Sequence, residues 1–235
     1  MNLLTAPQKP AEYAEDALIS AILDGTYPPG TPLPAERELA SQLGVTRPTV
    51  REVLQRLSRD GWLMIRQGKS TQVNDFWRDG GLNVLSVLVR HQSQLPADFI
   101  PNLLAVRLDL APSYARAAVR HSPAAVAGYL AGWTALPDTA EAFAAFDWGL
   151  HRALTIAASN PIYTLILNGF AGFYEQMARQ YFESAAARAA SRQFYAALHA
   201  AAQANAADAA EAITRQVIEA SIEFWRHVKS EPSRS

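Results

Sequence analysis

The chain has 235 residues, enough for one large or two ordinary domains, and its apolar share of 49% argues against disorder away from the ends. It contains no cysteine, which excludes a disulfide framework, a thiolate nucleophile and thiolate zinc sites. The formal net charge is −1, but residues 31–72 hold seven basic and four acidic side chains, a local net charge of +3 that suits an anionic partner.

The chain opens with helices that alternate with turn residues. Apolar side chains at helical spacing predict a helix over residues 11–24. A short helix over 34–43 ends at Gly44, and a third helix over 46–59 begins at Thr46, a residue type that caps helix N-termini. Two helices joined by a tight glycine turn are a helix-turn-helix unit. The predicted core face of the third helix is Val50, Val53, Leu54 and Leu57.

Beyond the third helix the periodicity changes. Residues 62–66 and 71–73 predict two short strands, and residues 67–70 predict the turn between them. A β-hairpin directly after a helix-turn-helix unit forms the wing of a winged helix. We therefore predict that the first domain, residues 1–74, is a winged helix-turn-helix.

Residues 75–81 predict a linker, after which the pattern is helical to the C-terminus. Proline and polar breaks divide the second predicted domain, residues 82–235, into helices at 82–89, 98–120, 124–136, 140–158, 161–183, 186–204 and 207–229. The alanine-rich run at 185–212 predicts a close-packed helix pair. The predicted fold class is mainly α: an N-terminal winged helix-turn-helix with a small β-hairpin, and an all-α C-terminal helical bundle.

The first turns of the third helix carry the strongest candidates for reading DNA, because these turns enter the major groove in helix-turn-helix proteins. They present Thr46, Arg47, Thr49 and Arg51 away from the core face. Arginine can make two parallel hydrogen bonds to guanine, and threonine can contact a phosphate or a thymine methyl group. Arg37 lies on the preceding helix, and the Gly68-Lys69 turn can enter the minor groove. Ordinary solvated side chains are the alternative, but the wing beside a basic leading turn favours DNA binding.

Two segments resemble the N-terminal signature of the GntR family of bacterial transcriptional regulators. They are PGTPLPAERELA at 29–40 and GVTRPTVREVL at 44–54. Further segments resemble the members that regulate fatty acid metabolism, namely 55–63, 102–107, 159–163 and 165–169. The resemblance covers nearly the whole chain and weakens after about residue 185.

The resemblance implies a homodimer that binds a near-palindromic operator in double-stranded DNA. It implies an effector-binding and dimerisation domain over 82–235 that binds long-chain acyl-CoA, whose binding releases the DNA. It also implies repression of fatty acid degradation and activation of unsaturated fatty acid synthesis, with no cofactor. Since no apolar run approaches a membrane span and the N-terminus has no secretory pattern, we expect a cytoplasmic protein with no membrane partner.

Residue positions are carried over from the family one by one. The DNA-contacting positions are Arg37, Thr46, Arg47, Thr49, Arg51, Gln67, Gly68 and Lys69, with Gln67 in place of a histidine. The acyl-CoA positions are Arg107, Tyr174, Tyr181, Tyr195, Arg215, Ser221 and Trp225. Arginine suits CoA phosphates, the aromatic side chains suit an apolar channel, and serine suits a polar part of the ligand. Ile218 stands where these members have glycine beside the ligand, and its branched side chain would narrow that entrance.

Other functions remain as alternatives. A related regulator could respond to a small carboxylate, since many proteins with this type of effector domain bind a metal through one Asp and three His. Asp147 and His151 match the first pair, but Ala196 and Ile218 stand at the later positions, and we predict no metal. An enzyme would need a nucleophile elbow, a phosphate loop or a metalloprotease motif, and none is present. A pure dimerisation module would not explain the basic helix beside a wing.

Overall fold

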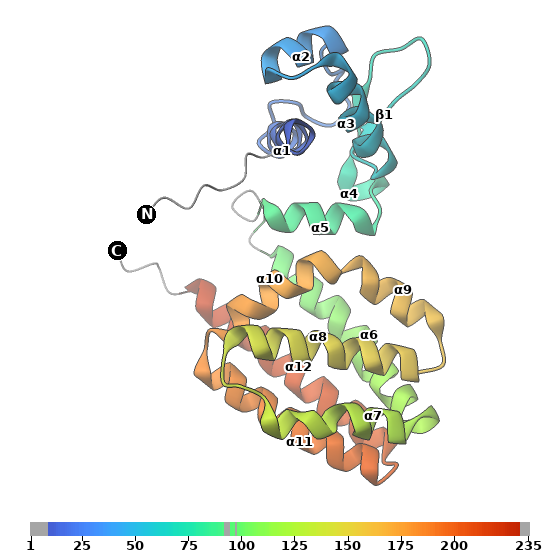
Figure 1. Cartoon of the computed structure of the whole chain (residues 1–235), viewed down its shortest axis with the longest axis vertical. Helices are drawn as coiled ribbons and strands as arrows, with labels where there is room; N and C mark the ends of the chain where they lie inside the picture. Colours follow the sequence, from blue (N-terminus) through green and yellow to red (C-terminus); the bar gives the residue numbers. More distant parts are fainter. Residues whose placement is uncertain (1–8, 92–94, 97, 231–235) are drawn as a thin grey trace. The chain divides into compact units, whose positions relative to one another are not determined.

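The computed structural model describes residues 9–91, 95–96 and 98–230 (Figure 1). The chain forms two compact units, divided between Leu95 and Pro96. Within the described residues, no helix combines the length and the apolarity that a membrane span requires.

Over its described residues, the N-terminal unit has five helices and a two-stranded antiparallel sheet. Its elements are α1 (Pro10–Leu23), α2 (Glu36–Leu43), α3 (Arg47–Arg59), β1 (Leu63–Met64), β2 (Gln72–Val73), α4 (Phe76–Asp79) and α5 (Leu82–Arg90). In the sheet, Leu63 pairs with Val73 and Met64 with Gln72. The predicted winged helix-turn-helix is confirmed, and so is the core face of α3, since Val50, Val53, Leu54 and Leu57 are all buried.

The turn between α2 and α3 follows from two local signals. Gly44 adopts a left-handed conformation (φ +65°) after α2, which is a geometry that glycine reaches without steric cost. Thr46 then caps α3, because its side-chain oxygen accepts a hydrogen bond from the Thr49 amide at 3.3 Å. The two residues end α2 and begin α3, and the first turn of α3 lies at the surface, where Thr46 and Arg47 are exposed.

The wing is smaller than predicted and is joined by the segment of the chain that precedes α2. Of the predicted strands 62–66 and 71–73, only Leu63–Met64 and Gln72–Val73 are regular. The chain before α2 runs beside β2: the Gly30 amide donates to the Val73 carbonyl at 2.8 Å, and the Val73 amide donates to the Thr31 carbonyl at 2.9 Å. A hairpin of two short strands is only marginally stable alone, so these hydrogen bonds from the chain before α2 hold the wing against the domain.

The predicted linker, residues 75–81, contains the short helix α4. Phe76 is buried, and its ring lies 4.7 Å from that of Trp62, between centroids. After it, the Asn83 side chain donates to the Asp60 carboxylate at 3.3 Å. The contacts of the chain therefore group α4 and α5 with the N-terminal unit, whereas the sequence pattern predicts that the second domain begins at residue 82.

The C-terminal unit is entirely helical over its described residues (Figure 1). Its elements are α6 (Phe99–His121), α7 (Pro123–Leu130), the 3-10 helix η2 (Ala131–Ala135), α8 (Ala140–Ala157), α9 (Pro161–Gly169), α10 (Ala171–Phe182), α11 (Ala185–Gln203) and α12 (Ala207–Ser230). The long helix α6 packs against α12 and α8, while α11 packs against α12 and α7. The alanine-rich run forms α11 and the start of α12, and buries Ala187, Ala201, Ala202 and Ala210 as a close-packed pair would.

The prediction of one helix over 161–183 is wrong. The helix is interrupted at Phe170, between α9 and α10. There the Phe170 amide donates to the Leu167 carbonyl at 2.9 Å in a tighter turn. Gly169 weakens the helix at this point, because glycine costs about 1 kcal/mol relative to alanine in a helix interior. The predicted helix over 124–136 likewise ends early and continues as η2. The helices on both sides of this break, α9 and α10, pack against α8.

Candidate functional site

The first candidate surface is the leading turn of α3 with the facing end of α2. Arg37, Thr46 and Arg47 are exposed, and Thr49 is half-buried. The hydroxyls of Thr46 and Thr49 lie 2.8 Å apart and are hydrogen-bonded to each other, so their side chains are ordered before any ligand is present. Neither Arg37 nor Arg47 forms an ion pair with a described residue. The structure thus places these predicted DNA-contacting residues together at one surface.

Arg51 differs from the other predicted contacts because it is already paired. Its guanidinium binds the Glu36 carboxylate through Nε, at 3.2 Å from both carboxylate oxygens, and through Nη2, at 2.7 Å from Oε2. The hydrogen bonds from Arg51 hold the pKa of Glu36 below its ordinary value, and the nearby charges of Arg51 and Arg47 act in the same direction. Glu36 is not among the predicted site residues, although it lies in the signature segment next to Arg37.

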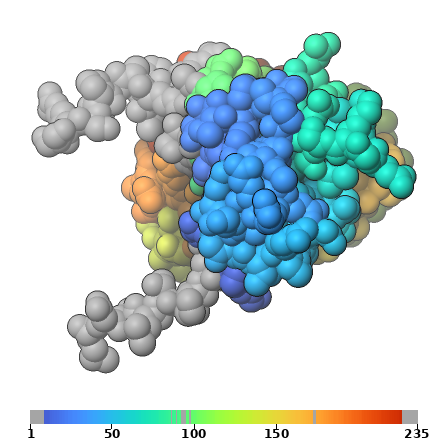
Figure 2. Space-filling view, turned by 90° about the horizontal axis from the view of Figure 1, so that it is seen from above, coloured from blue at the N-terminus to red at the C-terminus, as the bar shows by residue number. Residues whose placement is uncertain are grey.

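The wing tip carries the remaining predicted DNA contacts. Gln67, Gly68 and Lys69 are all exposed between β1 and β2. Gly68 has φ +73°, and the Lys69 amide closes the turn on the Arg66 carbonyl at 3.1 Å. In Figure 2 the teal atoms that follow α3 in the sequence project beside the blue atoms of the first helices of this unit. The tip has room for a close backbone approach, since a Cβ on Gly68 would meet nothing within 4 Å.

Arg56, late in α3, has a structural role. Its guanidinium donates to Glu15 of α1 at 2.7 Å and to Glu52 at 2.8 Å. The Glu15 side chain is only 12% exposed, so this pair joins α3 to α1 at the edge of the core. Arg59 is exposed at the end of the helix. Arg56 thus has ion-pair partners, whereas Arg37 and Arg47 form no ion pair with a described residue.

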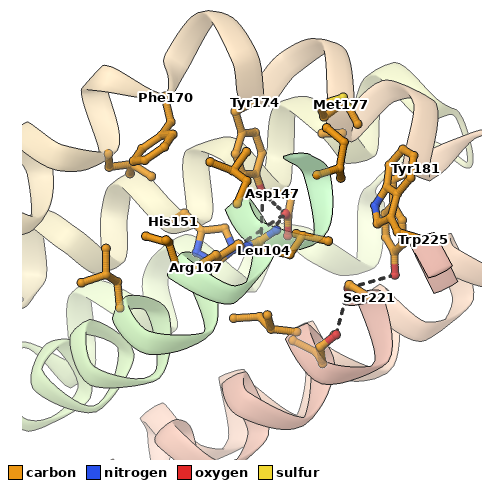
Figure 3. Close-up of a pocket in the computed structure, with 18 of the residues that line it drawn as sticks. Leu104, Arg107, Asp147, His151, Phe170, Tyr174, Met177, Tyr181, Ser221 and Trp225 are labelled. Atoms are coloured by element: carbon orange, nitrogen blue, oxygen red, sulfur yellow. Dashed lines mark hydrogen bonds and ion pairs between the residues drawn. The ribbon is translucent and has the colours of Figure 1, made fainter. Parts of the chain in front are cut away.

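The second candidate site is a cavity in the helical unit (Figure 3). Its volume is about 120 Å³. Its wall is mostly apolar and comes from α6, α8, α9, α10, α11 and α12. Leu104, Phe170, Met177 and Trp225 are among the side chains that line it. An apolar wall with a few polar groups is typical of a small-molecule site.

Two predicted polar positions in this wall, Arg107 and Tyr174, meet two residues from α8, and a third, Tyr195, reaches the same network from behind the wall. Arg107 donates from Nη2 to His151 Nε2 and, at 3.3 Å, to the Tyr174 hydroxyl, and it lies 3.5 Å from Asp147 Oδ2. Asp147 accepts hydrogen bonds from the hydroxyls of Tyr174 and Tyr195. The network carries one positive and one negative charge, so it is balanced, as buried ionic groups need to be.

His151 is the neutral member of the network. Burial and the neighbouring Arg107 cation lower its pKa to about 3, although Asp147 acts in the opposite direction. Since Nε2 accepts from Arg107, the proton sits on Nδ1, which lies 2.7 Å from the Tyr114 hydroxyl. Burial also raises the pKa of Tyr114, Tyr174 and Tyr195, so these hydroxyls keep their protons. For Arg107, burial disfavours the charged guanidinium and by itself would lower its pKa. Tyr174 and Asp147 act in the opposite direction and outweigh burial, so the pKa of Arg107 is raised.

Five of the seven predicted effector residues line the cavity: Arg107, Tyr174, Tyr181, Ser221 and Trp225. Ser221 donates to the Tyr181 hydroxyl at 3.3 Å or to the Val217 carbonyl at 2.9 Å. Tyr195 does not line the cavity: it is fully buried and bonds Asp147. Arg215 also lies outside the lining, exposed and 3.7 Å from Glu211. Ile218 is buried in the wall, where it takes up space in the cavity.

The sequence analysis missed most of the apolar wall. Leu103, Leu104 and Leu110 of α6 line the cavity together with Arg107. Their helical spacing around Arg107 was the available signal, because it puts them on a face next to the arginine. Residues from α9 and α11 carry no comparable signal, since which of their faces turns to the cavity depends on how the helices pack.

The pair Asp147 and His151 was weighed as half of a metal site. The structure places the Arg107 guanidinium against both side chains. Among the described residues, no group of three His, Cys, Asp or Glu side chains converges as metal ligands would. The guanidinium of Arg107 is therefore the cation that balances the Asp147 carboxylate.

The pKa of His151 predicts how stability depends on pH. The unfolded histidine takes up a proton below about pH 6.5, whereas the folded one does not until about pH 3. Its contribution to stability is therefore complete above pH 6.5 and is lost as the pH falls, at up to about 1.4 kcal/mol per pH unit. We expect the free energy of unfolding, measured by urea denaturation from pH 7 to 5, to fall less steeply in His151→Gln than in the wild type. The exposed His121, changed to Gln, is the control and should keep the wild-type slope.

A winged helix with a basic leading turn, joined in one chain to a helical unit with a cavity, is the architecture of a DNA-binding transcription regulator. Residues 10–73 match the profile of bacterial regulatory proteins of the gntR family, and residues 74–234 match that of the FadR C-terminal domain. The chain therefore belongs to the GntR family. This family consists of transcription regulators, and the prediction that the chain is not an enzyme is confirmed.

Curated relatives are similar over most of their length. The fatty acid metabolism regulator protein of Pectobacterium atrosepticum is 44% identical over 223 residues, which cover 95% of this chain and 93% of that protein. The protein of the same name from Yersinia pestis is 49% identical over 188 residues, 80% of this chain and 79% of that protein. Among solved structures, Lar, which controls the Listeria monocytogenes agr system, has a TM-score of 0.63 at 14% identity over 97% of this chain and 100% of that chain, and shares the fold.

Proposed function

We propose that the chain regulates fatty acid metabolism as a homodimer on a near-palindromic operator, and that long-chain acyl-CoA in the cavity of the helical unit releases the DNA. In this proposal it represses fatty acid degradation, activates unsaturated fatty acid synthesis and works in the cytoplasm, where the operator is. The names of the curated relatives support the metabolic role. The geometry supports the binding of DNA and of an apolar ligand.

Support for operator reading comes from the surface around Arg37 and Arg47. Both side chains are exposed, and neither is neutralised by an ion pair with a described residue. The ordered pair of Thr46 and Thr49 lies beside them. Cationic side chains near the N-terminus of a recognition helix can reach base edges and phosphates together, and this combination is what sequence-specific binding requires.

The observation that carries the ligand assignment is Arg107 in an apolar cavity. Arg107 contacts the network through Nη2, while its Nε and Nη1 groups donate to no described residue. These N–H groups suit the polar part of a ligand whose chain lies along Leu104, Phe170 and Met177. A small carboxylate would satisfy the arginine but leave the apolar wall unused, so an acyl conjugate fits the site better.

A mobility-shift titration tests this function. The operator is selected from a random-sequence DNA library by the wild-type protein, and binding should saturate at two chains per operator. Oleoyl-CoA should weaken operator binding by roughly 5- to 150-fold, the usual range of allosteric coupling, while oleate and free CoA should act far less. Linkage also requires operator DNA to weaken oleoyl-CoA binding by the same factor.

The outcomes separate the two parts of the proposal. Release by succinate without release by any acyl-CoA would overturn the ligand class and leave DNA binding intact. If the protein selects no sequence from the library, the role as a specific regulator is wrong. A series of acyl chain lengths then reports the space left by Ile218, since a chain too long for the cavity should release DNA less well.

A further inference from the structure

Glu36 and Arg51 form an ion pair across the helix-turn-helix unit. Glu36 is the first residue of α2, and Arg51 lies in the second turn of α3. Three N···O contacts between 2.7 and 3.2 Å join them, so one edge of the guanidinium faces the carboxylate. The Arg51 side chain is 64% exposed, and the Glu36 side chain is 31% exposed. The pair therefore lies at the surface that carries the predicted DNA contacts.

The geometry leaves the rest of the guanidinium available. Glu36 occupies Nε and one N–H of Nη2, and Arg51 makes no hydrogen bond from Nη1 to a described residue. The free edge, formed by Nη1 and the second N–H of Nη2, has the two parallel donors that match guanine O6 and N7 or two phosphate oxygens. A long arginine side chain loses several rotamers when it is fixed, and Glu36 fixes this one before DNA arrives.

The charge of Glu36 is otherwise unfavourable at such a surface. A carboxylate near DNA is repelled by the phosphates and weakens binding to every sequence. Glu38 lies two residues further along the same helix and has the same charge. Its carboxylate accepts a hydrogen bond from the neutral side chain of Gln42 at 3.3 Å. The two acidic residues of α2 thus differ in one respect that matters here: only Glu36 holds an arginine of α3.

We propose that Glu36 is a positioning residue that orients Arg51 and thereby sets the sequence discrimination of the DNA-binding surface. The inference rests on the proposed reading of an operator by α3. In this role the Glu36 carboxylate weakens binding to DNA of any sequence, and it raises the preference for the operator over random DNA. These two effects have opposite signs, and they can be measured separately.

The test compares Glu36→Gln with Glu38→Gln on two probes, the selected operator and random DNA of the same length. Each substitution removes one negative charge, so both variants should bind random DNA more tightly than the wild type by a similar factor. Glu38→Gln should tighten operator binding equally and leave the ratio of operator to random affinity unchanged. Glu36→Gln should lower this ratio by at least about fivefold, because a misplaced bidentate contact loses discrimination.

A double-mutant cycle ties the effect to Arg51. In an Arg51→Ala background, Glu36→Gln should change the ratio no further, since there is no guanidinium left to orient. Repeating the selection with Glu36→Gln should relax the same operator position that Arg51→Ala relaxes. An unchanged ratio in Glu36→Gln, or an effect that persists without Arg51, overturns the inference. Failure of the wild type to select any operator would instead contradict the proposed function.

Discussion

Replacing Asp147 by alanine should lower the free energy of unfolding of the helical unit by roughly 3–5 kcal/mol, the usual cost of removing one partner of a buried ion pair. Asp147 is 6% exposed and accepts hydrogen bonds from Tyr174 and Tyr195. Without it, the Arg107 cation has no counter-ion in an apolar wall, and two buried hydroxyls lose their acceptor. Thermal unfolding should therefore begin at a temperature lower by roughly 10 °C.

The matched control is Asp138→Ala. Asp138 pairs with Arg188 at 3.0 Å and with Arg192 at 3.7 Å, but its side chain is 64% exposed. Arg188 also donates to the Phe182 carbonyl and keeps this bond in the variant. Surface pairs contribute about 0–1 kcal/mol, so this change should have a small effect. Equal losses of unfolding free energy in the two variants, measured by urea denaturation, would mean that Asp147 in the cavity network contributes no more to stability than a surface ion pair does.

Arg47→Ala should abolish most operator preference while leaving the fold intact. Arg47 is the first residue of α3, exposed and on the same face as Arg51 one turn later. A base contact by arginine is worth about 1–3 kcal/mol of discrimination, so each lost contact should weaken operator binding by roughly 5- to 150-fold. Binding to random DNA should fall much less, and the dependence on salt should become shallower as one cation is lost.

Arg59→Ala provides the comparison for this experiment. Arg59 is also exposed on α3, but it lies at the opposite end of the helix from the leading turn. The same change of charge should leave the ratio of operator to random affinity near the wild-type value. If Arg47→Ala instead weakens both probes by the same factor, Arg47 contacts phosphates only, and the bases are read by other residues of the leading turn.

The candidate DNA-binding surface could be predicted in large part because its signals are local. Gly44 marks the turn through its left-handed backbone, and Thr46 marks the start of α3 through its cap. The hydrophobic spacing in α3 then fixes which side chains face outward. The pair of Glu36 and Arg51 escaped prediction, since it joins two helices whose crossing angle no local pattern specifies.

The cavity was predictable only in part. Most of the carried-over residues line it, but Tyr195 bonds Asp147 from outside the lining, and Arg215 lies at the surface. The break at Phe170 was missed because a glycine lowers helix propensity without forbidding a helix. After this break α10 packs against α8, and Tyr174 donates to Asp147 there.

The leading turn of α3 and the wing tip could thus be located from local patterns, because caps, turns and periodicity depend on residues only a few positions apart. Three features could be seen only in the folded chain: the pairing of residues 30–33 with residues 71–73, the orientation of Arg51, and the meeting of Arg107 with Asp147 and His151. Each of these joins segments distant in the chain. The backbone pairing and the Arg107 network form where packing brings polar groups out of water together, since a buried charge or amide without a partner is too unfavourable to persist. The orientation of Arg51 depends instead on the packing of α2 against α3, which brings Glu36 within reach of it.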